Sequence, residues 1–568
     1  MSIMSGASLS PPMTGCEAAD RLIRRARRSF DDIVAAKERA QADVEAIANE
    51  MSAMVAAKGG VWQLTDTEGE IMVNAGGVVF PVSRRALLMP FMKRRYISVL
   101  LMHHAGGLPK DPDGHLYLET SSAYFEAFWD ELTLYQTGRT DTVTLPASKA
   151  SDPLYNDYHA LFMSEISCYS APQQTSAAAT AAPMEVDGHT PDTQPADTSD
   201  EMQQHIRECE EALRAHGAAM VGLRAVRDDI QRFLTAMEPF FASRHAEDNA
   251  ILSLTIHSRK VSIMRKSLER LGHNHPLLTR FSTTPPCFAD RSVRQTPTKC
   301  FMAAVEFARC IATMPTERLI RPPLVEEGDK RHFVEDIEMY GLKYQPLCNG
   351  VTSGDFVIET AEEWGKVIDM TGKHSPTATL IYKSSRDTLS YASLFNKVVG
   401  KGGLLFAIKQ GDTHRFGCFI DGEIEPPADP TETNQYRAPV VFFSLSGAYE
   451  TPTKIELPEE RQWVEVAGTQ GAVEDPKWLP LANVAIARGY LCLGFAMPGP
   501  AADLSRCCQW IEEQQLPAEG YRGNRRWMAS TDIDSLDYNG AVVGSLGSSF
   551  VFTCRELEVW HITAGTSC

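Results

Sequence analysis

The chain repeats one pattern, and this internal duplication restricts its fold more than any other feature of the sequence. Residues 71–87, IMVNAGGVVFPVSRRAL, and residues 252–268, LSLTIHSRKVSIMRKSL, share apolar positions and a basic pair at an offset of 252 − 71 = 181. Further on, TSSAYFEAFWDEL (120–132) matches TPTKCFMAAVEFA (296–308) at an offset of 296 − 120 = 176. Self-similarity of this kind predicts that one supersecondary unit, a strand, turn, strand and helix with further helices, occurs twice.

A helical segment with heptad spacing precedes each copy. We expect a coiled-coil helix over 17–57 and a second helix or coiled coil over 204–241. The first could instead be an amphipathic helix packed on its own domain. The predicted seams are Ile23, Ala26, Phe30, Ile33, Lys37, Ala40, Val44, Ile47, Met51 and Met54, and then Met202, Ile206, Cys209, Leu213, His216, Met220, Leu223, Arg227, Ile230, Leu234 and Met237.

Residues 171–203 have the composition of a disordered linker. They are rich in Ala, Thr, Pro, Asp and Gln and almost lack large apolar residues, so little could offset the entropy lost on ordering. Residues 21–30, RLIRRARRSF, form a basic cluster in an otherwise acidic chain. An anionic membrane surface, an acidic partner or the acidic linker could bind it, although a charged flank of the coiled coil explains it as well.

The Asn-Ala-Gly-Gly sequence at 74–77 could cradle a phosphate or only turn the chain. Neither the Walker pattern nor the dinucleotide pattern is present, and an apolar strand follows directly, so we predict a hairpin turn. The second copy supports this interpretation, because His257 and Ser258 replace the glycines while the flanking pattern persists.

The runs VNAGG-VFPVSRRALL, DGHLYLETSSAYFEAFWDELTLYQTG and a following Leu-Pro resemble the potassium-channel tetramerisation type of BTB/POZ domain. The resemblance covers 68–165, and more weakly 249–343, the first and second copies named below. It implies two α/β modules that self-associate or act as adaptors. Some relatives bind zinc through a histidine and adjacent cysteines; neither copy has such a pair, so we expect no metal, and we expect His103 and His104 to be solvated loop residues.

The last third of the chain has many short apolar segments separated by turns, which predicts a β-sandwich with flanking helices. SSRDTLSYASLFNK, VVFFSLSG and the terminal LEVW resemble a TLDc domain over 351–563, the domain of oxidation-resistance proteins. Residues 456–535 depart from that family with insertions. The resemblance implies oxidative-stress protection and binding of the vacuolar proton-pumping ATPase, without an established active site.

Several residues in this region could in principle be catalytic, and we expect none of them to be. Cys418 or Cys554 would need His414 beside it to act as a nucleophile. Asp387 is expected to cap a helix, and Glu556 and Glu558 to lie on one solvated strand face. The candidates are Asp387, His414, Cys418, Cys554, Glu556 and Glu558.

The formal net charge of −18 argues against nucleic acid as the general partner, and no apolar stretch is long enough to span a bilayer. Scattered cysteines and the absence of a signal-peptide pattern predict a cytoplasmic location. We therefore expect a multidomain α+β protein that is not an enzyme, needs no cofactor, and forms homo-oligomers as a scaffold. The alternatives are a cullin-type ubiquitin-ligase adaptor and, third, a catalytic antioxidant.

Overall fold

The computed structural model describes residues 15–150, 152–166, 198–256, 259–272, 275–281, 296–351, 356–373, 376–470, 482–495, 503–527 and 542–563. They belong to two units. Unit 1 contains Met1–Asp66, Ser98–Gly107 and Glu165–Met237, and unit 2 contains Thr67–Ile97, Leu108–Ser164 and Glu238–Cys568. Most of the expected linker (171–203) lies outside the described residues, and the helix after it already begins at Thr198.

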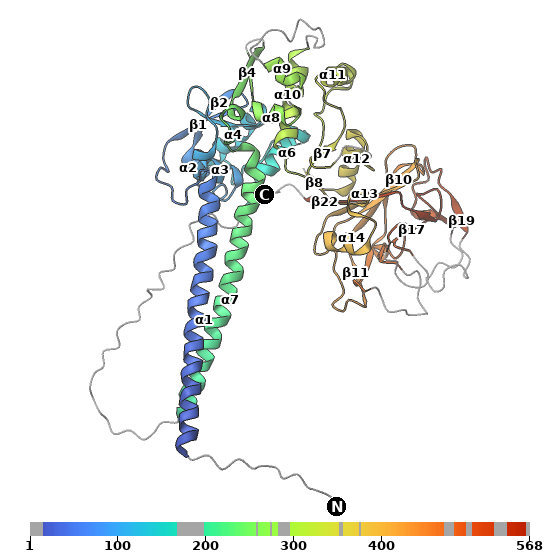
Figure 1. The fold of residues 1–568 in the computed structure, drawn as a ribbon. Helices are drawn as coiled ribbons and strands as arrows, with labels where there is room; N and C mark the ends of the chain where they lie inside the picture. Colours follow the sequence, from blue (N-terminus) through green and yellow to red (C-terminus); the bar gives the residue numbers. More distant parts are fainter. Residues whose placement is uncertain are drawn as a thin grey trace, which may run out of the picture. The chain divides into compact units, whose positions relative to one another are not determined.

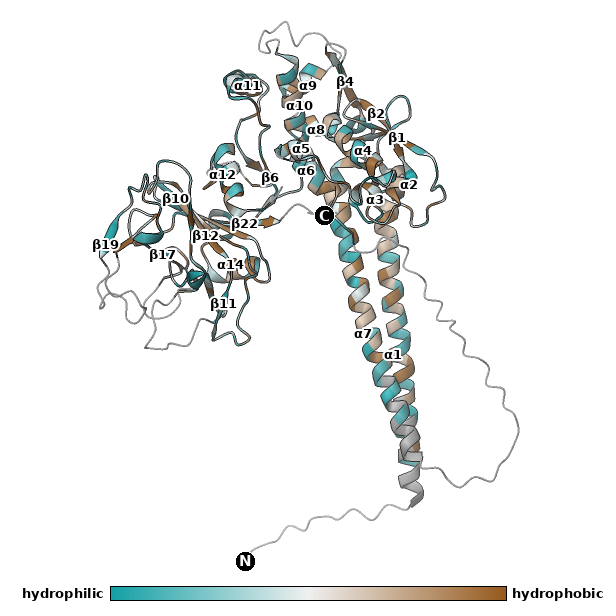
Figure 2. Cartoon of the chain, turned by 180° about the vertical axis from the view of Figure 1, so that it is seen from behind, coloured by the Kyte–Doolittle hydropathy of each residue, from teal (hydrophilic) through white to brown (hydrophobic). Residues whose placement is uncertain are grey.

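Unit 1 is built on two long helices, α1 (Gly15–Ala57) and α7 (Thr198–Met237), which lie side by side in Figures 1 and 2. A guanidinium nitrogen of Arg227 lies 3.7 Å from the carboxylate of Glu50, at an offset of 227 − 50 = 177. In both helices the buried residues are concentrated toward the carboxyl end. The two helices therefore run parallel, and a residue of α1 lies level with the residue of α7 that follows it by 177 positions.

The predicted seam is buried in one half of this helix pair and exposed in the other. Toward the carboxyl ends, the buried seam residues are Ile47, Met51, Met220, Ile230, Leu234 and Met237; Val55 and Phe233, which the predicted seams did not include, are buried as well. Toward the amino ends, the seam residues Ile23, Phe30, Ile33 and Leu213 are exposed. The helices are thus as expected, while coiled-coil geometry along their whole length remains a prediction.

The expectation that His103 and His104 are solvated loop residues is wrong for His104, which is buried, and places His103 in a loop although it belongs to a helix. His103 is the last residue of α3 (Tyr96–His103), where its Nδ1 lies 2.9 Å from the carbonyl oxygen of Val61. His104 is fully buried, its ring 5.4 Å from that of Phe233 and its Nδ1 3.2 Å from the carbonyl oxygen of Lys58. Burial lowers the pKa of His104 to about 4.

The first copy begins with the predicted hairpin. β1 (Glu70–Ala75) pairs antiparallel with β2 (Val78–Ser83), and β3 (Leu116–Leu118) pairs parallel with β1, giving the order β2-β1-β3. Helices α2 (Arg84–Leu87), α4 (Ser122–Gln136) and α6 (Pro153–Phe162) follow these strands.

The second copy repeats these elements at the spacing found in the sequence. β4 (Ile251–Ile256) and β5 (Arg259–Met264) form a hairpin whose strands begin 181 residues after β1 and β2, since 251 − 70 = 181 and 259 − 78 = 181. Helix α10 (Thr298–Thr313) begins 298 − 122 = 176 residues after α4. The turn at His257 and Ser258, and residues 282–295, lie outside the described residues.

Short elements complete the two copies and connect them. They are η1 Ala105–Gly107, α5 Ala147–Ala150, η2 Glu238–Phe240, η3 Ala246–Asn249, α8 Arg265–Glu269, α9 Pro276–Phe281, β6 Leu319–Ile320, α11 Glu327–Met339 and β7 Leu347–Cys348.

The C-terminal region is rich in sheet, as expected for an α+β chain. One six-stranded sheet has the order β13 (Thr453–Glu456), β12 (Val440–Ser446), β10 (His414–Ile420), β9 (Leu404–Gln410), β22 (Glu556–Thr563), β8 (Thr377–Lys383). The other has the order β11 (Thr433–Arg437), β14 (Trp463–Ala467), β15 (Val484–Ile486), β16 (Leu491–Leu493), β17 (Arg506–Gln509), β21 (Val551–Thr553). A small sheet contains β18 (Ile511–Glu512), β20 (Val542–Gly544) and β19 (Arg525–Trp527).

Two apolar cores hold this region together. The larger core joins residues from both six-stranded sheets, such as Phe416 and Leu491. The smaller core lies on the other face of the first sheet, where α12 (Ala361–Thr371) packs. There the rings of Trp364 and Trp560 meet edge to face, 4.7 Å apart. Helices α13 (Ser384–Asp387) and α14 (Tyr391–Val398) and the turns η5 (Glu459–Arg461) and η6 (Glu513–Gln515) complete the region.

Among the helices described, none is long and apolar enough to cross a membrane.

The burial of His104 predicts a specific loss of stability in acid. The unfolded chain takes up a proton near pH 6.5, but the folded chain does so only near pH 4, so stability falls as the pH is lowered through this interval. The loss attributable to His104 should reach about 3 kcal/mol, and His104→Leu should remove it. Urea denaturation between pH 7 and pH 4 measures it, with a His216→Gln variant of the same unit as the control. An acid loss as large in His104→Leu as in the wild type would contradict the assignment.

Candidate functional site

The Gly76-Gly77 turn joins β1 to β2, as the sequence predicts. Both glycines have positive φ, +57° and +113°. The side chain of Asn74 holds the turn, because its Oδ1 accepts a hydrogen bond from the backbone N–H of Gly77 at 3.0 Å. Its Nδ2 donates to Asp111 at 2.8 Å, so one buried amide fixes the hairpin to the turn before β3.

This turn also lies directly against the second copy. The backbone N–H of Ser262 in β5 donates to the carbonyl oxygen of Gly76 at 2.9 Å. A Cβ atom on Gly77 would lie 2.9 Å from the carbonyl oxygen of Lys260 and 3.0 Å from the backbone nitrogen of Ser262. The glycines therefore turn the chain and also permit close approach of the second copy's backbone.

A buried ion pair lies beside the turn and joins the two copies. Glu119 follows β3 of the first copy, and its Oε1 accepts from Nε of Arg309, on α10 of the second copy, at 2.6 Å. Both side chains are fully buried. The other carboxylate oxygen of Glu119 accepts from the backbone N–H of Met264 at 2.6 Å and from the Ser267 hydroxyl at 3.3 Å. We call Glu119 and Arg309 the inter-copy pair.

Further polar contacts surround Arg309. Its NH2 donates to the carbonyl oxygen of Ser262 at 2.5 Å, and its NH1 lies 2.6 Å from the Glu306 carboxylate. The Tyr117 hydroxyl donates to the same carbonyl of Ser262 at 2.9 Å. Burial would lower the pKa of Arg309, but Glu306 and Glu119 raise it above its ordinary value. Burial raises the pKa of Glu119 against the opposing effect of Arg309.

One group of side chains has the spacing of metal ligands. In the described part of the chain, Asp111, Asp113 and His115 have ligand atoms within 4.8 Å of one another. Asp111 Oδ1 accepts from the backbone N–H groups of Asp113 and His115, and Oδ2 is bonded to Asn74 and to His115 Nδ1. Burial would raise the pKa of Asp111, but these hydrogen bonds lower it. The hydrogen bonds of the turn therefore account for this cluster without a cation.

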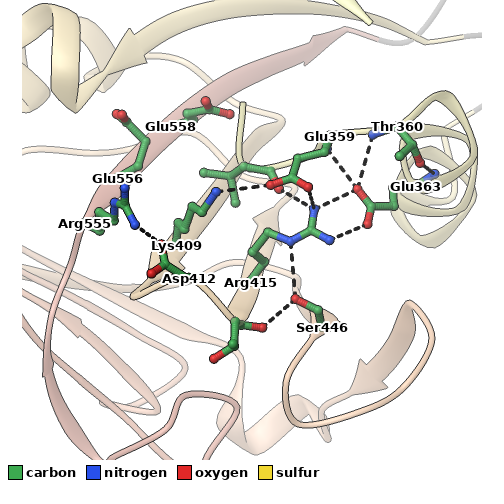
Figure 3. Close-up of polar contacts among 12 residues, drawn as sticks. Glu359, Thr360, Glu363, Lys409, Asp412, Arg415, Ser446, Arg555, Glu556 and Glu558 are labelled. Atoms are coloured by element: carbon green, nitrogen blue, oxygen red, sulfur yellow. Dashed lines mark hydrogen bonds and ion pairs between the residues drawn. The ribbon is translucent and has the colours of Figure 1, made fainter. Parts of the chain in front are cut away.

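A row of charged residues crosses the first sheet of the C-terminal region (Figure 3). Glu556 of β22 pairs in register with Lys409 of β9, Lys409 with Arg415 of β10, and Arg415 with Ser446 of β12. At the end of the row, the exposed Arg555 forms an ion pair with Asp412.

Arg415 connects this row to α12. Its NH1 and NH2 donate to the two carboxylate oxygens of Glu363 at 2.9 and 2.7 Å, and NH1 also donates to the carbonyl oxygen of Val357. Glu363 forms a capping box with Thr360 at the helix start. Lys409 donates to Glu359 at 3.1 Å. The charges neutralise one another and fix the amino end of α12 on the sheet, leaving Glu359, Asp412 and Arg555 toward solvent.

The expectation that Glu556 and Glu558 lie on a solvated strand face is wrong. Glu558 is fully buried, its Oε1 2.6 Å from Lys383 Nζ and its Oε2 accepting from Trp560 Nε1 at 3.1 Å. Glu556 accepts from the Ser384 hydroxyl at 2.6 Å and lies 3.6 Å from Lys383 Nζ. Burial raises the pKa of Glu558, and Lys383 partly opposes this. The two carboxylates therefore join β22 to the end of β8.

Asp387 does not cap the helix that follows it, so that prediction is also wrong. Asp387 is the last residue of α13, and Ser390 precedes α14. Its Oδ2 accepts from the backbone N–H of Lys383 at 3.0 Å and from Arg386 at 2.7 Å. Burial would raise the pKa of Asp387, but these hydrogen bonds lower it.

Cys418, as predicted, is a buried apolar residue, and burial raises the pKa of its thiol. His414 lies on the same strand four residues away, which corresponds to about 13 Å. The thiol of Cys554 donates to the carbonyl oxygen of Glu556 at 3.2 Å and is hydrogen-bonded to Cys507. Among the contacts of the described residues, none brings His414 to either cysteine.

Sequence reasoning missed the residues that form the strongest polar contacts, namely Glu119, Arg309, Lys383, Glu363 and Arg415. The Thr-x-x-Glu pattern at 360–363 was a readable signal for a helix start. Glu119 and Arg309 are 190 residues apart in sequence, and each occurs in an otherwise apolar segment with no local indication of a partner.

The close approach at Gly77 can be tested by comparing two alanine substitutions at positive φ. Gly138 has φ +70° and open space around its Cβ position, whereas Gly77 faces the backbone of Lys260 and Ser262. Gly138→Ala should cost about 1 kcal/mol from backbone strain alone. Gly77→Ala should cost about 2–4 kcal/mol, because φ +113° lies outside the left-handed region open to alanine and because β5 must also move. Urea denaturation measures both; equal costs would show that the second copy does not constrain the turn.

The two parallel hydrogen bonds from Arg415 to the carboxylate of Glu363 are predicted to anchor α12. A lysine at position 415 tests this role, because it keeps the charge but cannot form both hydrogen bonds. Arg415→Lys should cost about 1–2 kcal/mol of stability and speed hydrogen exchange of the first amides of α12. The matched control is Arg555→Lys, an exposed pair that should cost less than about 0.5 kcal/mol. Unchanged exchange in α12 with Arg415→Lys would contradict the anchoring role.

Comparison with known proteins adds one finding. No curated protein sequence matches the chain. One family model does match, and its range contains β9, β10, β12 and every member of the charged row except the residues of the 555–558 segment. Residues 358–451 are a TLDc domain.

Proposed function

We propose that this protein is a non-enzymatic oligomeric scaffold. Its helices and its two BTB/POZ-like copies serve association, and its TLDc region binds a partner. The observation that carries the proposal is the inter-copy pair, because a fully buried carboxylate and guanidinium are costly to desolvate and are retained here at a contact between modules. Residues of both copies are therefore committed to module contacts.

The TLDc domain suggests a role related to oxidative stress or to the vacuolar proton-pumping ATPase. We propose the second of these as a direct interaction. The exposed ends of the charged row, Glu359, Asp412 and Arg555, offer alternating charges on a rigid edge, a surface suited to a polar protein partner. In this proposal the scaffold presents several such edges in one assembly.

The state of the cysteines favours partner binding over thiol catalysis. A reactive thiol needs a lowered pKa, since the thiolate is the nucleophile. Burial instead raises the pKa of Cys508 and Cys348 to about 12 each, and it raises the pKa of Cys418 and Cys492 further. The side chain of Cys507 and burial together raise the pKa of Cys554. For any of these five thiols to reduce a peroxide, the thiol would first have to be exposed.

The partner proposal is tested by direct binding of the purified full chain to the isolated cytosolic sector of the proton pump and, separately, to a cullin. We expect binding to the pump sector, and at least about a tenfold loss in Asp412→Lys/Arg555→Glu, because each reversed charge meets the wrong sign on the partner. The control reverses another exposed pair, Glu450→Lys/Arg522→Glu. Binding to the cullin alone would instead identify a ubiquitin-ligase adaptor, and binding to neither would overturn the proposal.

A further inference from the structure

The amino-terminal halves of α1 and α7 expose residues that a helix pair should bury. Ile23, Phe30 and Ile33 of α1 are 65, 66 and 54% exposed, and Leu213 of α7 is 63% exposed. Ile23 and Phe30 have the heptad phase of Met51, which is buried in the carboxyl half of α1. Ile33 has the phase of the buried Ile47, and Leu213 has the phase of the buried Leu234. Most of the stability of a helix in a protein comes from packing of its apolar face against a neighbour, so the exposed stripe indicates a missing neighbour.

In the amino-terminal half of the helix pair, positive and negative residues occupy separate segments. The basic tip, residues 21–28 of α1, carries Arg21, Arg24, Arg25, Arg27 and Arg28. The offset of 177 between Glu50 and Arg227 places the basic tip level with residues 198–205 of α7, a segment whose sequence has two acidic residues and no Lys or Arg.

Net negative charge follows at the next levels. The acidic zone comprises residues 31–38 of α1 and the level residues 208–215 of α7. Its acidic members are Asp31, Asp32, Glu38, Glu208, Glu210 and Glu211, and its basic members are Lys37 and Arg214. One end of the helix pair therefore carries a positive segment followed by a negative one.

We propose that the missing neighbour is the same segment of a second chain, packed antiparallel so that each basic tip meets the other chain's acidic zone. Parallel, in-register packing would put basic tip beside basic tip. We number the levels along the helix pair by the residues of α1 and subtract 177 from the numbers of α7. In the antiparallel arrangement, residue n of one chain faces level 59 − n of the second chain, so residues 21–28 face levels 38–31. The apolar residues then coincide as well: Ile23 faces level 36, where 213 − 177 = 36 places Leu213, and Phe30 lies close to the second chain's Phe30.

This arrangement forms a short four-helix bundle at the amino ends, with an apolar interior and charged flanks. It rests on the proposed self-association and adds the segment, orientation and residues that make the contact. Because exposed charge pairs are screened by salt, dimerisation should weaken between about 0.05 and 0.5 M salt but persist through the apolar contacts.

Charge exchange in the full chain provides the test. An acidic-tip variant carries Arg24→Glu, Arg25→Glu and Arg28→Glu; a basic-zone variant carries Asp31→Lys, Asp32→Lys and Glu211→Lys. Sedimentation equilibrium should show dimer dissociation constants at least about tenfold higher for each variant, and recovery to within about threefold when both sets are combined in one chain. Circular dichroism of each variant checks that helix content is retained.

A second pair of variants tests the apolar contact. Phe30→Ser should also raise the dissociation constant at least about tenfold, because Phe30 lies near the two-fold axis of the bundle. Val551→Ser, another exposed apolar residue, is the control and should leave it unchanged. An oligomer of unchanged mass and affinity in all variants would overturn the tip contact while leaving self-association intact. A wild-type chain that stays monomeric at micromolar concentration would overturn both.

Discussion

Glu119 and Arg309 are fully removed from solvent. In this pair the first copy supplies the carboxylate and the second copy supplies the guanidinium. Each charge would be strongly destabilised without the other, since breaking a buried pair typically costs about 3–5 kcal/mol. The first copy has Thr133 at the position that corresponds to Arg309 (309 − 176 = 133), so the same bond cannot form with the roles of the copies exchanged. The two copies have thus diverged, so that the second copy always donates the hydrogen bond and the first copy always accepts it. The glycine turn and β5 lie beside this pair.

The duplication could be predicted because it depends on local patterns. Apolar periodicity, a basic pair and a turn are visible in either copy, and β1, β2, β4 and β5 occur where those patterns predict them. The contacts between distant segments could not be predicted in this way. Glu556 and Glu558 alternate with apolar residues, a pattern typical of a solvated face. Only the sheet order, which brings Lys383 of β8 next to β22, makes that face a buried one.

The prediction that His104 is solvated was wrong for a related reason. Two adjacent histidines before a Gly-Gly pair are typical of a solvated loop, but the neighbour that buries His104 is Phe233 of α7, 129 residues later in the chain (233 − 104 = 129). Charged and ionisable residues were misread wherever their partner came from another part of the sequence. The apolar Cys418 was read correctly, because its burial follows from the alternation along β10 alone.

The position of β22 has a consequence for how the chain is made. β22 lies between β9 and β8 in the interior of its sheet, yet it follows them by more than 140 residues (556 − 410 = 146). During synthesis, β8 and β9 leave the ribosome before the strand that pairs with both of them. Trp364 is likewise made before Trp560, the ring against which it packs. A strand gap of this kind exposes unpaired backbone groups to other chains. The first six-stranded sheet is therefore completed only after translation has passed β22, and a chain shortened before Glu556 would lack the strand that closes it.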